Sequence, residues 1–288
     1  MNQQRIDRRR GIGLVFAAAL LWSTGGIGIK AIDDPALKVA CLRSAIAAVA
    51  LFALFRPRFV RFTPGFILSV ISYAACLTTF VMATKWTTAA NAIFLQYSGV
   101  IWVLLLSPWL LKEPLTARDT VAITVALGGM ALFFVEDFDT RGVTGNVMAV
   151  VSSLFFAALI ISLRKQRGVA SEAAVTYGNV LAALALLPFV AGDLSLTPKS
   201  VGILLYLGVF QIAVAYGLFV RGLSYVTATQ ASLTGMIEPV ANPLWVFLLL
   251  GERPSSYAIT GGAIVLAAIC WRTLTRGEPA AAPIPPPD

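Results

Sequence analysis

The sequence contains no histidine and few charged residues, and both shortages exclude classes of function. Without histidine, the chain can form neither His-ligated metal sites nor histidine proton relays. Charged residues make up 12% of the chain and hydrophobic residues 58%, so the charged share is about half that of an average soluble domain. A Gly-rich phosphate loop and a nucleophile elbow are also missing. We therefore expect a polytopic membrane protein without a metal, a cofactor or catalytic residues.

Neither the cysteines nor the positive net charge indicates a partner outside the membrane. Cys41, Cys76 and Cys270 lie inside apolar runs without CxxC spacing, which is typical of small packing residues. The net charge of +8 is spread over short clusters between apolar runs, with no basic face and no interleaved aromatics. This pattern is typical of loops that flank membrane helices, so we expect a lipid bilayer around the protein and no nucleic-acid partner.

Ten apolar stretches have about the length that a helix needs to cross a bilayer. They cover roughly residues 11–30, 36–55, 66–84, 87–110, 117–135, 144–164, 171–191, 199–221, 225–250 and 256–275. The basic segment 1–10 precedes an apolar run that is too long for a signal peptide, so we predict an uncleaved first span. Residues 276–288 are proline-rich and are expected to form a disordered tail. The sequence predicts an all-α integral membrane protein.

Lysine and arginine are distributed unevenly between the predicted loops. If the N-terminus lies in the cytoplasm and the spans alternate, most of these residues fall on the inner side. Arginines cluster at 5–10, 56–61 and 164–167, for example, all on that side. The positive-inside rule therefore predicts that both termini are cytoplasmic, in a bacterial-type inner membrane.

The two halves of the chain match when one is shifted onto the other. A single shift places residues 87–113 on residues 226–252 without a gap, with Thr88 on Thr227 and Glu113 on Glu252. A slightly smaller shift places Lys30 on Arg164. Five spans is an odd number, so the second half would enter the membrane from the opposite side. We predict two inverted five-helix repeats, residues 11–140 and 141–275, around a central cavity near the membrane midplane.

Three stretches and one residue carry a resemblance to a known family. They are "AALLWSTGGIGIK" in the first span, Arg43 in the second, "WLLKEPLT" at the end of the fourth and "IEPVANPLWVFLLLGERPS" in the ninth. The chain resembles the drug/metabolite transporter superfamily, in its ten-helix branch with two EamA-like repeats, and is most similar to YddG-type exporters of aromatic amino acids. The resemblance implies ten helices around a central cavity and export from the cytoplasm without ATPase or other enzyme activity. One departure is that Gly99-Val100 stands where the second half has Glu238-Pro239.

Two ionisable residues lie deep within predicted spans, where charge is costly and usually marks function. Glu238 could carry a proton, accept a substrate ammonium, or bind backbone groups freed near Pro239. Arg43 could hold a substrate carboxylate, pair with Glu238, or form a snorkelling or structural contact. Because Pro239 lacks an N–H group, the carbonyl of Gly235 loses its usual helical donor. We expect this part of the ninth span to face the cavity.

Polar amides and aromatic rings also occur near the middle of the spans. Such rings, with a few polar groups, could line a pocket for a flat apolar ligand, although many could equally be packing residues. The candidate substrate-binding residues are Trp22, Arg43, Tyr73, Asn91, Gln96, Tyr97, Trp102, Phe156, Tyr177, Gln211, Tyr216, Gln230 and Glu238.

The leading functional hypothesis is a secondary transporter that exports small amphiphilic metabolites, with aromatic or other apolar amino acids as favoured substrates. A multidrug or organic-cation exporter is the alternative within transport, because Glu238 and aromatic faces suit a cation. An integral-membrane enzyme acting on a lipid lacks support, since the chain has no histidine and no closely spaced pair of acids within a span. The sequence favours no particular oligomeric state.

Overall fold

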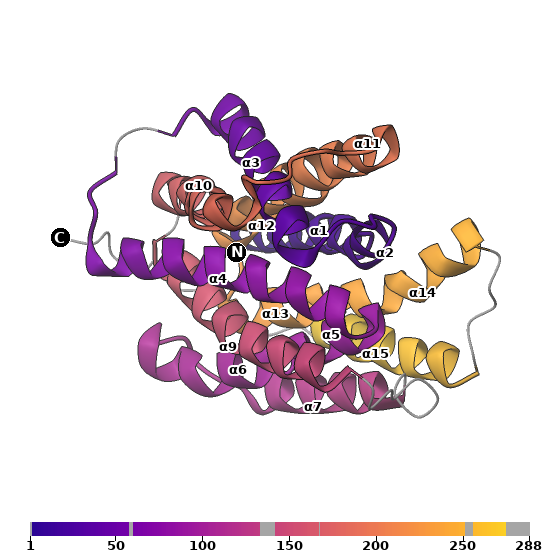
Figure 1. The fold of residues 1–288 in the computed structure, drawn as a ribbon. Coiled ribbons are helices and arrows are strands. Elements are labelled where there is room, and N and C mark those ends of the chain that lie inside the picture. Colours follow the sequence, from indigo (N-terminus) through magenta and orange to yellow (C-terminus); the bar gives the residue numbers. More distant parts are fainter. Residues whose placement is uncertain (1, 58–59, 133–141, 167, 251–255, 275–288) are drawn as a thin grey trace.

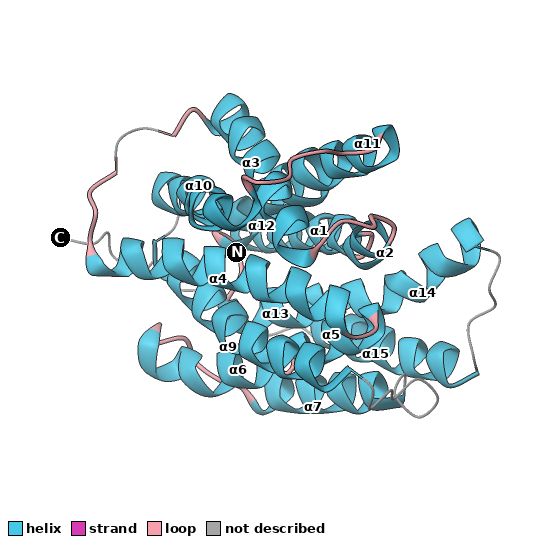
Figure 2. Ribbon diagram, in the orientation of Figure 1, coloured by secondary structure: helices cyan, strands magenta, loops and turns pink. Residues whose placement is uncertain are grey.

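The structure is a computed structural model that describes residues 2–57, 60–132, 142–166, 168–250 and 256–274. Within these ranges the regular secondary structure is helical throughout (Figure 2). This confirms the all-α prediction. The predicted tail at 276–288 and the repeat residue Glu252 lie outside the described residues.

Each of the ten predicted spans coincides with one helix or with a run of consecutive helices (Figure 1). The first half contains α1 (Asn2–Trp22) with α2 (Gly25–Lys30), α3 (Ala36–Phe55), α4 (Pro64–Trp86), α5 (Ala89–Tyr97) with α6 (Gly99–Leu110), and α7 (Ala117–Leu132). The second half contains α9 (Val143–Gln166), α10 (Gly168–Val190), α11 (Pro198–Tyr206) with η2 (Leu207–Val214) and α12 (Ala215–Leu223), α13 (Ala228–Gly235) with α14 (Ile237–Leu250), and α15 (Ser256–Leu274). Helix α1 starts at Asn2, so the basic segment is continuous with the first span.

The distribution of polar and apolar side chains is that of a membrane protein. Seven helical spans in the described residues are long and apolar enough to cross a bilayer, and 259–274 is a shorter apolar helix. Large apolar side chains such as Trp109, at 83% exposure, cover the outside, whereas Arg43, Arg164 and Glu238 are buried. Water would not favour this arrangement, but a lipid surround does, because polar groups must then find partners inside the bundle.

Threonine caps set the start of four helices, and they fall at matching places in the two halves. The hydroxyl oxygens of Thr88 and Thr227, which the predicted repeat aligns, accept hydrogen bonds from the third backbone N–H of α5 and α13. Thr63 and Thr197 cap α4 and α11 in the same way, each followed by a proline at the first helical position. Threonine before proline is a strong helix-start signal, because the cap satisfies a free N–H and proline has none to leave unpaired.

Several spans are interrupted near their middle. Ser23 and Thr24 separate α1 from α2, Ser98 separates α5 from α6, and Met236 separates α13 from α14. The serine and threonine hydroxyls at the first two breaks donate to carbonyls three residues earlier, at distances of 2.6–2.7 Å. These side chains therefore replace helical partners where the backbone turns. In the eighth span, η2 is a wider π-helix, a form that is often found at functional sites.

The closest packing joins helices of the first half to helices of the second. Helix α4 packs along α9, α3 along α10, α7 along α15, and α1 along α12. The two halves are thus interleaved in one bundle rather than placed side by side. As a result, the interrupted spans α1–α2, α5–α6, α11–α12 and α13–α14 can contribute side chains to a shared centre.

Candidate substrate-binding site

Arg43 lies on α3 and is fully buried, with 0% of its surface exposed. Its Nη1 atom donates to the Oε1 atom of Gln211 at 3.4 Å, while Nε and Nη2 have no hydrogen-bond partner. The hydroxyls of Tyr73 and Tyr216 and the thiol of Cys76 lie within electrostatic range of the guanidinium group. The guanidinium thus has polar neighbours but no carboxylate partner among the described residues.

Two glycines allow Gln211 to reach Arg43 from the π-helix η2. A Cβ atom on Gly25 would lie 2.6 Å from the amide nitrogen of Gln211, so any larger residue at the start of α2 would displace that side chain. A Cβ atom on Gly208 would lie 2.5 Å from a methyl group of Ile46 and 3.1 Å from the carbonyl oxygen of Arg43. The two close approaches bring α2, α3 and η2 together around one amide and one guanidinium.

An aromatic layer lies beside these polar groups. The rings of Trp22 and Tyr216 have centroids 4.8 Å apart, those of Tyr73 and Tyr216 are 4.7 Å apart, and those of Trp22 and Phe219 are 4.9 Å apart. The hydroxyl of Tyr73 accepts a hydrogen bond from the amide of Asn179 at 2.9 Å. The indole N–H of Trp22 is buried without a partner. The layer therefore combines aromatic faces from both halves with an available donor.

Glu238 follows the break between α13 and α14 and is bound by Tyr97. The Tyr97 hydroxyl lies 2.8 Å from the Oε2 atom of Glu238 and 2.6 Å from the carbonyl oxygen of Gly235. Gly235 is the residue whose carbonyl loses its helical donor to Pro239. Tyr97 satisfies the carbonyl that proline leaves free and holds the carboxyl group beside it. No ion pair joins Glu238 to Arg43, although both residues are described.

A small polar network of Gln96, Ser152 and Cys76 lies near both charged residues. The amide of Gln96 donates to the hydroxyl of Ser152 at 2.8 Å, and Ser152 donates to the carbonyl of Cys76 at 3.1 Å. Cys76 lies within electrostatic range of both Glu238 and Arg43. Phe156 packs on the Tyr97 ring at a centroid distance of 5.7 Å. Arg43 and Glu238 thus share a polar neighbourhood that includes Cys76.

Four candidate residues from the sequence lie away from this neighbourhood. The side chain of Asn91 is near the N-terminus of α5 and donates to Thr87, while Gln230 lies in the first turn of α13. Tyr177 packs with Phe62 and Phe66. Trp102 is 43% exposed on α6. The structure therefore does not bring these four residues together with Arg43, Tyr97 and Glu238.

Sequence reasoning missed several residues of this site. Ser152 and Phe219 carry no sequence signal, because a serine or phenylalanine in an apolar helix is common. The sequence predicts that Cys76 is a packing residue, and only the structure shows that its thiol lies within electrostatic range of both Glu238 and Arg43. Asn179 is a buried amide in a predicted span, so its need for a partner was a usable signal.

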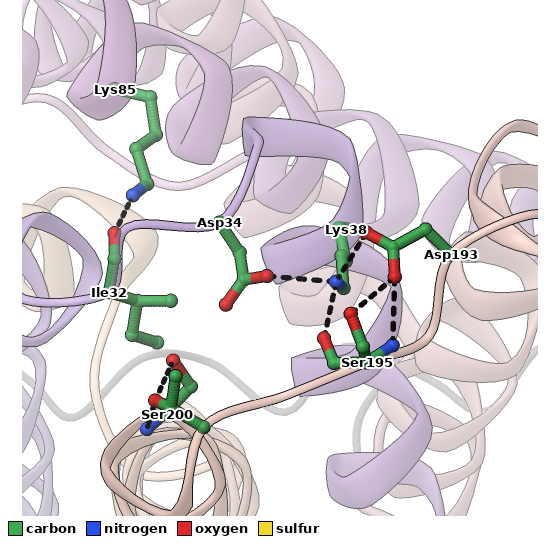
Figure 3. A network of polar contacts seen from close by, with 8 residues as sticks. Ile32, Asp34, Lys38, Lys85, Asp193, Ser195 and Ser200 are labelled. Atoms are coloured by element: carbon green, nitrogen blue, oxygen red, sulfur yellow. Dashed lines mark hydrogen bonds and ion pairs between the residues drawn. The ribbon is translucent and has the colours of Figure 1, made fainter.

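A separate polar cluster lies at the end of the bundle that is predicted to face outward (Figure 3). The ammonium group of Lys38 binds Asp34 at 2.9 Å, Asp193 at 3.2 Å and the carbonyl of Ser195 at 2.5 Å. Hydrogen bonds from the side chain and backbone of Ser195, and then from Lys38, lower the pKa of Asp193 to about 2. In the same region Lys85 donates to the carbonyl of Ile32. The cluster therefore links the start of α3 to the connection at residues 191–197.

Comparison with known proteins identifies the family. The model of the EamA-like transporter family matches residues 9–135 and matches again at residues 143–274. The chain belongs to the EamA-like transporter family. The family model thus occurs twice in this EamA-like protein, and the predicted resemblance to the drug/metabolite transporter superfamily is confirmed.

Several curated relatives of this EamA-like protein are named as transporters or exporters. It is 27% identical to an uncharacterized transporter of Archaeoglobus fulgidus, over 92% of this chain and 97% of the relative. It is 24% identical to the pseudopaline exporter CntI of Pseudomonas aeruginosa, over 93% and 97%. The threonine/homoserine exporter RhtA of Salmonella typhimurium is 26% identical, over 84% and 83%. These similarities support a membrane exporter.

A solved crystal structure of a protein has the same fold. It superposes with a TM-score of 0.77 at 17% identity, over 93% of this chain and 98% of the other. At this identity the match concerns the fold alone. It shows that the EamA-like chain adopts an arrangement of helices already seen in a crystal.

Proposed function

We propose that this protein exports small amphiphilic metabolites from the cytoplasm by alternating access, with aromatic or other apolar amino acids as the favoured substrates. The observation that carries the proposal is the buried aromatic layer beside Arg43. Trp22 and Tyr73 come from the first half and Tyr216 and Phe219 from the second. Trp22 ends α1 at the break in the first span, and Tyr216 lies in the first turn of α12, directly after the π-helix η2. Apolar and aromatic walls with a few polar groups are what a small amphiphilic ligand requires.

The two halves support alternating access. In the proposed organisation, residues 11–140 and 141–275 form inverted repeats around a central cavity, and both termini are cytoplasmic. The matching threonine caps and the double match to the family model support this division. Because the halves interleave, a tilt of one against the other would change access to the aromatic layer.

One end of the bundle is closed by a buried contact that we name the inner clasp, made by Glu113, Arg164, Leu223 and Ala228. Arg164 Nε donates to one oxygen of Glu113 at 2.6 Å, and Nη1 donates to the carbonyl of Leu223 at 3.0 Å. The backbone N–H of Ala228 donates to the other Glu113 oxygen at 2.9 Å. In the proposed orientation this end is cytoplasmic. This buried contact supports an arrangement closed to the cytoplasm. At the opposite end, α14 runs away from the bundle toward Leu250 (Figure 1).

Transport by purified protein in liposomes tests the proposal. Liposomes would be loaded with labelled phenylalanine, leucine, threonine or a cationic dye, and release would be followed with and without an imposed pH gradient. We expect release of the apolar amino acids, faster than of threonine or dye. Tyr216→Ala removes one ring of the aromatic layer and should slow release of phenylalanine about tenfold, which corresponds to about 1.4 kcal/mol of lost contact.

Trp109→Ala is the matched control, because it removes a large aromatic side chain that is 83% exposed. It should leave transport unchanged. No release of any amino acid by a well-folded sample would refute the proposal. Equal transport by the Tyr216 and Trp109 variants would assign the aromatic layer to packing.

An organic-cation exporter is the second candidate, and Glu238 is the observation in its favour. The carboxyl group is buried and contacts Tyr97, and no cation pairs with it among the described residues. A cation bound beside aromatic faces and this acid would be stabilised by both. Faster release of the dye than of every amino acid, abolished by Glu238→Gln, would favour this candidate.

A further inference from the structure

Three arginines are buried in the described part of the bundle, and two of them have an acid partner. Arg164 binds Glu113 at 2.6 Å, and Arg272 binds Asp119 at 2.6 Å. All four side chains in these pairs are at most 7% exposed. A buried guanidinium group without a counter-charge is costly, so these pairings are the expected solution.

Arg43 is the exception. It is as deeply buried as Arg164, yet no carboxylate among the described residues pairs with it. Among the described residues, its one hydrogen-bond partner is the neutral amide of Gln211, at the long distance of 3.4 Å. The aromatic layer and the Tyr73 and Tyr216 hydroxyls contribute dipoles but no formal charge to compensate the guanidinium group. The fold therefore keeps one cation in its interior that its own described side chains do not neutralise.

The free donors of Arg43 have a specific geometry. Nη1 is engaged by Gln211, and the partnerless atoms are Nε and Nη2. In a guanidinium group the N–H bonds of Nε and Nη2 point the same way along one edge. That edge matches the spacing of the two oxygens of a carboxylate and forms two parallel, charge-assisted hydrogen bonds. Water could satisfy the donors but would not supply the missing charge.

We infer that the Nε–Nη2 edge of Arg43 is a carboxylate-binding subsite, and that it holds the carboxylate of the exported substrate in two parallel hydrogen bonds. The amide of Gln211 orients the guanidinium group from its opposite side. The rings of Tyr216 and Trp22 then lie where the apolar part of the same molecule would pack. The inference rests on the proposed function only for the statement that the bound carboxylate belongs to a transported substrate.

Two ligands of the same shape separate a carboxylate site from an apolar one. 3-Phenylpropionate and 3-phenylpropanamide differ in the charged group and share the ring. Their binding to purified protein in detergent would be compared by the ligand concentration that raises the melting temperature of the protein by the same fixed amount. We expect the acid to bind at least tenfold more tightly than the amide, because only the acid carries a negative charge that can neutralise the Arg43 guanidinium group. Sodium chloride and sodium phosphate at equal concentration serve as inorganic-anion controls.

Variants then test whether the preference for the acid over the amide depends on Arg43. Arg43→Lys keeps the charge but lacks the planar edge, and should lose most of the tenfold ratio. Arg43→Gln should bring the ratio close to one. Trp102→Ala, on the exposed side of α6, should keep the wild-type ratio. If the Arg43 variants do not fold, the wild-type comparison of acid with amide still decides whether a carboxylate is required.

Equal binding of acid and amide by the wild-type protein would overturn the inference, as would a wild-type ratio in Arg43→Gln. An equal rise in melting temperature with chloride or phosphate, at the same concentrations as the acid, would also overturn the inference, because the site would then hold an inorganic anion. Failure of the proposed function would give a different set of results from failure of this inference. In that case liposomes release no amino acid, while the acid-to-amide ratio and its dependence on Arg43 persist.

Discussion

Removal of the charge of Glu113 should open the inner clasp. Arg164 is fully buried, Glu113 is 7% exposed, and both oxygens of the carboxylate are used, one by Arg164 and one by the N–H of Ala228. Glu113→Gln keeps the shape of the side chain but leaves the guanidinium group without a counter-charge. Breaking a buried pair in this way typically destabilises the contact by about 3–5 kcal/mol. At 1.4 kcal/mol per tenfold change, the lower figure shifts an opening equilibrium about 100-fold.

Chemical labelling measures this opening. Ala228 is fully buried at the start of α13, so a cysteine placed there should react with a maleimide only when the clasp opens. The background would carry alanine at Cys41, Cys76 and Cys270. We expect Glu113→Gln to raise the labelling rate about 100-fold, or to lower the melting temperature if the loss unfolds the protein instead.

A double variant distinguishes the charge effect from a general packing defect. Glu113→Leu combined with Arg164→Met removes both charges and keeps apolar volume, and such replacements are often close to neutral. The double variant should therefore melt at a higher temperature than Glu113→Gln. If Glu113→Gln has the wild-type melting temperature and the wild-type labelling rate, the clasp contributes nothing measurable and the reasoning is refuted.

Four further predictions concern Tyr97, Glu238, the C-terminus and Asp193. Tyr97→Phe should lower stability by about 1–3 kcal/mol, because it leaves a buried carbonyl without its donor, whereas Trp102→Ala should leave the melting temperature nearly unchanged. Glu238→Gln should alter the transport rate or its pH dependence more than the melting temperature; a wild-type rate at every pH would show that the acid is structural. A reporter fused after the last residue should be active only in the cytoplasm, and activity outside would contradict the predicted topology. Asp193→Asn should lower the melting temperature at neutral pH. Because the pKa of Asp193 is lowered to about 2, the ionised side chain stabilises the folded protein fully above about pH 4 and loses this effect as the pH falls through about 2. The melting temperatures of the variant and the wild-type protein should therefore converge near pH 2.

The sequence alone determined the class of protein and the order of its helices. The observed bounds agree with the predicted spans to within a few residues at most ends, because the thickness of the bilayer sets the length of an apolar run. The starts of some helices are also determined by neighbouring residues in the sequence, since Thr63 and Thr197 each precede a proline and cap the helix that follows. Even the opened backbone in the ninth span follows from Pro239, whose ring removes the donor of the Gly235 carbonyl.

Only the tertiary structure decided which way each side chain faces. In a soluble helix, polarity marks the exposed face, but in lipid both faces are apolar, so the sequence could not separate buried Tyr97 from exposed Trp102. The same limit applies to partners that are far apart in the chain. Tyr97 meets Glu238 across 141 positions, and Arg43 meets Gln211 across 168, through a π-helix that no local pattern predicts. Packing between the interleaved halves sets these distances, and it leaves Arg43 as the buried cation whose counter-charge the described side chains do not supply.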